Sequence, residues 1–286
     1  MYSQQISRAN PGYLLFLLDQ SGSMDEPIGR SSGTETKKDQ LALALNKLLL
    51  DIMIRSTRSD GVMHYFDISA IGYRTDQSQN PIISSAFGGG LSGRDCIPLP
   101  ELSENPAEMK TVQTKIFDDT TGEVKEVSSE APVWITPVAD GGTPMCNALY
   151  RAYELVNAWI ENGHQESFPP IVIHITDGES GDGDPIPYAD PLKSLSTNDG
   201  NVLLFNCHLS QSNADPFLFP SNGESLPDQF SRLLFDMSSE LPENAVAFAN
   251  RSGFQIDRNA RGMSYNADII TLIKFIDIGT RVASLR

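Results

Sequence analysis

Short runs that are apolar at nearly every position alternate along this chain with longer segments in which apolar residues recur at helical spacing. The run at residues 13–18 is apolar throughout and follows Pro11-Gly12, which is typical of a strand buried on both faces. Residues 37–54 instead place four leucines and an isoleucine on one helical face, as in a helix packed against a sheet.

The same patterns predict the remaining elements. Further strands are expected at residues 62–73, 82–87, 170–176, 201–208 and 233–235. Further helices are expected at residues 144–162, 191–195, 243–249 and 268–278. Strands that alternate with helices predict an α/β fold of the doubly wound type, in which a mostly parallel central sheet is flanked by helices.

Two segments interrupt this alternation. Residues 91–130 contain two strand-like stretches, 111–117 and 123–127, around a polar Asp-Asp-Thr-Thr-Gly tip, which predicts a β-hairpin insertion. Residues 209–230 are expected to form a long loop. We interpret residues 1–286 as a single domain that carries both insertions.

Composition narrows the possible partners. The net charge of −16 argues against binding to nucleic acid or to an anionic membrane surface. No apolar run approaches the length of a membrane-spanning helix, and the N-terminus lacks the apolar core of a signal peptide. The three scattered cysteines are typical of reduced thiols, so a cytoplasmic location is expected, and the four histidines show no metal-ligand spacing.

Candidate chemistry lies at the ends of two predicted strands and before one helix. Asp19, Ser21 and Ser23 follow the first strand as Asp-Gln-Ser-Gly-Ser, Asp177 follows the strand at 170–176, and Thr143 precedes the helix at 144–162. Open α/β sheets place ligand sites at the carboxyl ends of their strands, so these five oxygen side chains are expected to converge. Oxygen donors alone favour Mg²⁺ or Mn²⁺ over zinc.

With these residues in this order, the chain resembles the von Willebrand factor type A (vWA) domains, which have a Rossmann-like fold. The resemblance implies a metal-ion-dependent adhesion site (MIDAS) in which Asp19, Ser21, Ser23, Thr143 and Asp177 are the metal ligands, the two aspartates acting partly through water. It further implies that the metal captures a carboxylate of a protein partner without making or breaking a bond.

A binding module and a metal-dependent hydrolase or phosphatase are the two competing functions. Phosphoryl transfer needs a positioned acid or base and a cation near the phosphate, and the three loops place no Lys or Arg at the site itself. We therefore expect a binding protein and no enzyme. Asp25, Glu26 and Glu179 are candidates for an outer shell around the metal, although for Asp25 and Glu26 we favour ordinary solvated carboxylates. Ser21 and Ser23 are both expected outside the core.

A chain without a leader and with this acidity looks like the intracellular prokaryotic branch of the vWA family. That resemblance implies an adaptor in a bacterial multi-protein system of the stress, tellurite-resistance or defence type. Its expected partners are proteins such as a kinase, a phosphatase or an AAA+ ATPase.

Overall fold

A single mixed sheet forms the centre of the molecule. The computed structural model describes residues 2–27, 36–118, 123–209, 215–251 and 253–266. Within them, eight strands pair in the order β13-β14-β12-β9-β1-β4-β5, with β6 beside β4. Their bounds are β1 (Gly12–Asp19), β4 (Phe66–Thr75), β5 (Pro81–Ser85), β6 (Ile97–Pro98), β9 (Ile171–Thr176), β12 (Leu203–His208), β13 (Phe217–Leu218) and β14 (Met263–Tyr265). Strands β14, β12, β9, β1 and β4 run parallel and the outer strands run antiparallel, which confirms the predicted fold class.

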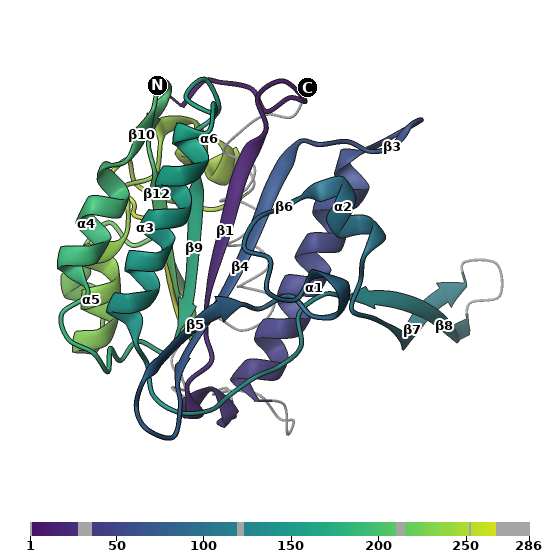
Figure 1. The fold of residues 1–286 in the computed structure, drawn as a ribbon, viewed down its shortest axis with the longest axis horizontal. Coiled ribbons are helices and arrows are strands. Elements are labelled where there is room, and N and C mark those ends of the chain that lie inside the picture. The colour runs from purple at the N-terminus through teal and green to yellow at the C-terminus, as the bar shows by residue number, and fades with distance from the viewer. Residues whose placement is uncertain (1, 28–35, 119–122, 210–214, 252, 267–286) are drawn as a thin grey trace.

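Helices cover both faces of this sheet (Figure 1). One face packs against α1 (Lys37–Ser56), α2 (Leu99–Glu104) and α6 (Glu243–Arg251). The other face packs against α3 (Met145–Glu161), α4 (Ile186–Ser194) and α5 (Gln229–Met237). Side chains of β1 alternate between these two cores, and all eight of its residues are buried. The centre of the fold is therefore the strand whose carboxyl end carries Asp19.

Short elements lie outside the main sheet. Two small hairpins pair β2 (Thr57–Arg58) with β3 (Gly61–Val62) and β10 (Ser196–Thr197) with β11 (Gly200–Asn201). Single helical turns are η1 (Gly22–Asp25), η2 (Gly89–Leu91) and η3 (Gly223–Ser225).

The predicted hairpin insertion is confirmed and is longer than expected. Strands β7 (Glu108–Asp118) and β8 (Glu123–Val133) pair over their whole length as a separate two-stranded ribbon. The ribbon projects from the body of the molecule on the side of α1 (Figure 1).

Several sequence predictions differ from the structure. The expected strand at 233–235 is wrong, because these residues lie in α5. Asp228 caps that helix by accepting a hydrogen bond from the backbone N–H of Ser231 at 2.7 Å. The last described strand is instead β14, which the sequence patterns did not predict. The segment 209–230 holds β13 and η3 and buries Phe219 and Leu226, so it contributes to the core as well as connecting elements. The helix expected at 268–278 lies outside the described residues.

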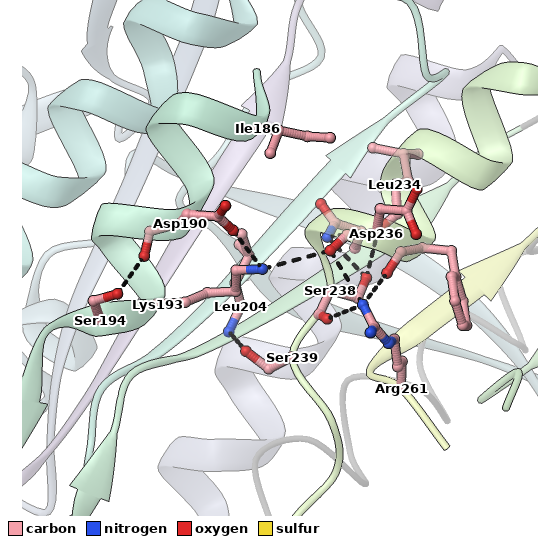
Figure 2. Close-up of polar contacts among 12 residues, drawn as sticks. Ile186, Asp190, Lys193, Ser194, Leu204, Leu234, Asp236, Ser238, Ser239 and Arg261 are labelled. Atoms are coloured by element: carbon pink, nitrogen blue, oxygen red, sulfur yellow. Dashed lines mark hydrogen bonds and ion pairs between the residues drawn. The ribbon is translucent and has the colours of Figure 1, made fainter. Parts of the chain in front are cut away.

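Two cations cap the carboxyl end of α5 (Figure 2). The Arg261 guanidinium donates to the backbone carbonyls of Phe235, Asp236 and Ser238 at 3.1–3.3 Å. The Lys193 ammonium lies 3.5 Å from the carbonyl of Asp236. Positive charge stabilises the carbonyl end of a helix, so these contacts tie α5 to α4 and to the segment that leads into β14. No helix in the described part of the chain combines the length and the apolar character needed to cross a bilayer.

Asn46 ties the segment that follows the ribbon to α1. Its side-chain oxygen accepts from the backbone N–H groups of Trp134 (2.8 Å) and Ile135 (3.1 Å), and its amide nitrogen donates to the carbonyls of Ile135 (2.7 Å) and Ala42 (2.8 Å). One side chain thus satisfies three backbone groups of the strand-like segment that leads on to Thr143.

We predict that Asn46→Leu lowers the free energy of unfolding by about 2 kcal/mol, because those backbone groups lose their partners while the volume is kept. Urea unfolding measures the change. Lys47→Leu, at the adjacent exposed position, is the control for helix propensity. Equal loss in the two variants would contradict the role given to Asn46.

Candidate metal site

Asp19, the last residue of β1, is completely buried. One carboxylate oxygen accepts the backbone N–H of Ser21 at 2.9 Å, and the other accepts the hydroxyl of Thr176 at 2.7 Å. Thr176 ends the neighbouring strand β9, so the parallel pairing of β1 and β9 fixes the carboxylate from two sides.

The two serines lie in the turn that follows. Their hydroxyl oxygens are 3.0 Å apart, and Gly22 between them donates its backbone N–H to the carbonyl of Gly141 at 2.9 Å. Ser21 is buried, which corrects the expectation that both serines lie outside the core; Ser23 is half-buried. The buried position follows from the hydrogen bond of Ser21 to Asp19, which draws the turn onto the end of the sheet.

The loop before Thr143 is held against the end of β4. Gly141 has a φ of +67°, and a Cβ atom there would lie 2.1 Å from the carbonyl oxygen of Thr75, so only glycine fits. Gly142 donates its N–H to the Thr75 hydroxyl at 2.7 Å, and the carbonyl of Thr143 accepts from Gly181 at 2.8 Å.

A hollow of about 460 Å³ joins the loops. Ser23, Thr143 and Asp177 all line it, while Asp19 and Ser21 are buried next to Ser23. The structure thus brings the five predicted residues to one edge of the sheet. Glu26 and Glu179 also line the hollow, whereas Asp25 pairs with Lys38.

The electrostatics of this edge favour a nearby positive charge. Burial raises the pKa of Asp19 to about 6, and the negative charge of Asp177 adds to the rise, while hydrogen bonds from Ser21 and Thr176 oppose it. Two carboxylates close enough to raise the pKa in this way are stabilised by a positive ion placed near them.

The donor set therefore fits a hard cation. Within the described residues, no three His, Cys, Asp or Glu side chains are arranged to hold a metal ion. A metal ion at this edge would therefore need the hydroxyl oxygens of Ser21, Ser23 and Thr143 in addition to the two aspartates. Such an all-oxygen set, with few charges, suits Mg²⁺ or Mn²⁺ and disfavours zinc.

Lys37 is a residue of this edge that the sequence patterns did not predict. Its side chain is only 4% exposed, and its ammonium lies 3.1 Å from a carboxylate oxygen of Asp177 and 3.2 Å from one of Glu26. The expectation that no cation lies beside the site is therefore wrong. Lys37 is the first residue of α1, and a helix that follows a parallel strand begins at the carboxyl edge of the sheet, so topology was the available signal.

His208, at the end of β12, supports the backbone of Asp177. Its Nε2 donates to the backbone carbonyl of Asp177 at 2.9 Å, and its ring stacks on Tyr265 with centroids 5.0 Å apart. Burial lowers the pKa of His208, so the ring is neutral. The histidine has a structural contact, as predicted, although it also borders the hollow.

A buried chain of hydrogen bonds runs from the site across the sheet. The amide nitrogen of Asn206 donates to the carbonyl of Leu234 at 3.2 Å, so its oxygen accepts from Nδ1 of His174 at 2.8 Å. Burial lowers the pKa of His174 to about 4, so the ring is neutral and its Nε2 accepts the Tyr73 hydroxyl at 2.7 Å. Tyr73 is the partner of Asp19 in the parallel register of β1 and β4, so this end of the chain lies beside the candidate site. Burial and then the charge of Asp19 raise the pKa of Tyr73.

Comparison with known proteins yields only distant likenesses. No family model matches the chain, and no curated protein matches it. Among solved structures, proximal thread matrix protein 1 from the mussel byssus is 15% identical over 70% of this chain, with a TM-score of 0.39. The vWF domain of the type V pili tip protein Mfa5 from Porphyromonas gingivalis is 12% identical over 59% of the chain, with a TM-score of 0.30. The PilB minor pilin from Streptococcus sanguinis is 12% identical over 99% of the chain, with a TM-score of 0.45.

The chain spans 39%, 38% and 62% of the lengths of these three structures, respectively. Likenesses this weak carry no information about function.

We predict that Asp19→Asn raises the stability of the metal-free protein at pH 7 by up to about 3 kcal/mol. The pKa of Asp19 is higher in the folded than in the unfolded chain, so ionisation of this group costs stability above pH 6. The cost disappears as the pH falls below about 4, where the group is protonated in both states.

Thermal melts in chelator across pH 4–8 measure this difference. Asp60→Asn, in the exposed β2–β3 turn, is the matched control. If the Asp19→Asn variant is less stable than the parent at pH 7, ionisation of Asp19 does not destabilise the folded protein and the prediction is wrong.

Proposed function

We propose that the chain is a vWA-type binding module that holds one Mg²⁺ or Mn²⁺ at Asp19, Ser21, Ser23, Thr143 and Asp177. Through this ion it recognises an acidic group of a protein partner. The observation that carries the proposal is the buried Asp19 carboxylate, whose pKa is raised by burial and by Asp177, beside a pair of serine hydroxyls at the edge of an open hollow.

The proposed ligands differ in the charge that they would offer to the metal ion. The hydroxyls of Ser21, Ser23 and Thr143 are neutral donors, and each oxygen of Asp19 already accepts one hydrogen bond, which reduces the negative charge offered to the ion. When bound, a cation held in this way remains electrophilic and supplies a position that a carboxylate can fill. The surrounding loops then orient that carboxylate.

A single carboxylate contact cannot select one partner, so additional surface is required. The ribbon β7–β8 supports this role, since it extends from the body beside α1 and exposes Met109 and Val112, with 50% and 37% of their surfaces accessible. We propose that the ribbon supplies part of the partner-specific contact, because connecting segments held on a rigid scaffold often carry binding residues.

We further propose that the protein acts as an adaptor in a bacterial multi-protein system of the stress, tellurite-resistance or defence type. A kinase, a phosphatase or an AAA+ ATPase is the kind of partner expected. This part of the proposal rests on the resemblance of the Asp-x-Ser-x-Ser, Thr and Asp pattern to the vWA family.

The presence of Lys37 bears on the competing function of a hydrolase. A lysine could balance a phosphate charge, but an ammonium has three N–H donors, and Lys37 has three acceptors in Asp177, Glu26 and the carbonyl of Ser23. The two described histidines nearest the site, His174 and His208, have lowered pKa values and are engaged with other groups. We therefore keep the proposal of a binding protein.

Calorimetry is expected to show one Mg²⁺ or Mn²⁺ site that Asp19→Ala abolishes. Ser23→Ala is the sharper variant, because Ser23 is not in the core. It should weaken the affinity at least about tenfold while leaving the melting temperature in chelator unchanged. Ser59→Ala, in the exposed β2–β3 turn, is the control.

Binding in Asp19→Ala equal to that of the parent would refute the site. Metal-dependent turnover of a phosphoester that Asp177→Ala removes would instead favour the hydrolase.

Shortening the ribbon tests the partner surface. Residues 112–129 are replaced by Asn-Gly. The four strand pairs from Glu108–Val133 to Thr111–Glu130 are kept, and a two-residue turn closes the last of them. The parent protein is used to capture proteins from a lysate in Mg²⁺, and those released by chelator are counted as metal-dependent partners. We expect the shortened variant to lose these partners while its Mg²⁺ affinity is unchanged. Quantitative mass spectrometry of the captured proteins, with Asp19→Ala as the metal-deficient reference, measures the outcome. Unchanged capture would place the specificity surface elsewhere.

A further inference from the structure

Lys37 is the one cationic side chain among the described residues that line the hollow. Its ammonium is 3.1 Å from Asp177, 3.2 Å from Glu26 and 3.3 Å from the carbonyl of Ser23. Two of these three partners belong to residues of the proposed metal site. The ammonium therefore lies against the same groups that a divalent cation would approach.

The surroundings of Lys37 explain why a charged side chain is stable in this buried position. Its side chain is 4% exposed and that of Asp177 is 10% exposed, so each charge is largely removed from water. A buried charge is tolerated when it is paired and hydrogen-bonded, and all three ammonium donors have an acceptor. No donor is left over for an anion of a partner, so Lys37 serves the protein's own carboxylates.

The helix geometry fixes this position. Thr36 caps α1 by a reciprocal pair of hydrogen bonds with Asp39, and the backbone N–H of Lys37 donates to the carbonyl of Glu26 at 3.0 Å. The side chain therefore projects from a helix end whose placement does not depend on a metal. The next residue, Lys38, starts from the same turn but is bound to Asp25 and is not among the residues that line the hollow.

We propose that Lys37 is a built-in counter-ion that neutralises the carboxylates of the metal-free site and competes with the divalent cation for them. This inference rests on the proposed metal site and adds a regulatory property to it. With Lys37 in place, the loops stay assembled without metal, and the site binds the cation more weakly than its ligand set alone would allow. Occupancy of the site then responds to the free concentration of the cation.

Neutral substitution of Lys37 tests this. Lys37→Met keeps the length of the side chain and removes its charge. In chelator, its melting temperature should fall by at least about 5 °C, because Asp177 and Glu26 are left without their cation. By calorimetry, its Mg²⁺ affinity should rise at least about tenfold over the parent, because a positive charge beside the ion is gone. Saturating Mg²⁺ should restore the lost stability.

Three further variants make the test specific. Lys38→Met, from the same helix turn, should change neither quantity. Lys37→Arg keeps the charge and should leave the affinity within about threefold of the parent. Lys37→Gln is a second neutral variant that can still donate hydrogen bonds, and its affinity should rise as in Lys37→Met.

The outcomes separate this inference from the proposed function. If the parent binds Mg²⁺ through Asp19 and the neutral variants bind it equally or more weakly, the counter-ion role is overturned and the metal site stands. Neutral variants that remain unfolded in saturating Mg²⁺ also overturn it, since the metal then cannot replace Lys37. If neither the parent nor any variant shows Asp19-dependent binding of Mg²⁺, the proposed metal site is refuted. The proposed competition between Lys37 and the cation is then refuted as well.

Discussion

The burial of the Asp19 carboxylate at the carboxyl end of the central strand is the constraint around which this molecule is organised. A charged group in that position is unfavourable unless its surroundings compensate, and the negative charge of Asp177 increases the cost. Much of what surrounds it can be understood as compensation. The N–H of Ser21 and the hydroxyl of Thr176 each satisfy one oxygen of Asp19, and Lys37 pairs with the neighbouring Asp177 from a different element.

The same constraint extends into the core. Tyr73, His174 and Asn206 form a hydrogen-bonded chain from the neighbourhood of Asp19 to the carboxyl half of α5. Each group in this chain has a defined donor or acceptor role, because Asn206 must donate to a carbonyl and His174 is neutral. Buried polar networks of this kind stabilise one arrangement only when every member is satisfied, so the site and the helix packing are specified together.

Sequence patterns predicted the parts of this fold that depend on local periodicity. The apolar run before Asp19, the stripe on α1 and the polar tip of the β7–β8 hairpin each determine an element by themselves. The strand-end positions of Asp19 and Asp177 were enough to predict that these residues lie at one edge of the sheet. What could not be predicted depends on tertiary contacts. Residues 233–235 are apolar enough for a strand, and it is the tertiary pairing of β14 with β12 that fills this position in the sheet. The cap formed by Asp228 is a local signal for the helix, which the apolar run outweighed. Likewise, no local pattern shows that the side chain of Lys37 turns inward while that of Lys38 faces Asp25.

The ribbon β7–β8 and the central sheet differ in their local stability against unfolding. Its described side chains at residues 111–113 and 128–130 are all exposed, so no second layer buries either face there. Two strands without a packed face contribute little stability beyond their own backbone ladder. Opening the outer ladder therefore leaves the central sheet and its two cores intact, and the amide hydrogens of the ribbon should exchange with solvent through local unfolding rather than through unfolding of the whole domain. The protein thus has a rigid unit that fixes the carboxylates in place and a second, less stable unit that can change its conformation without cost to the first.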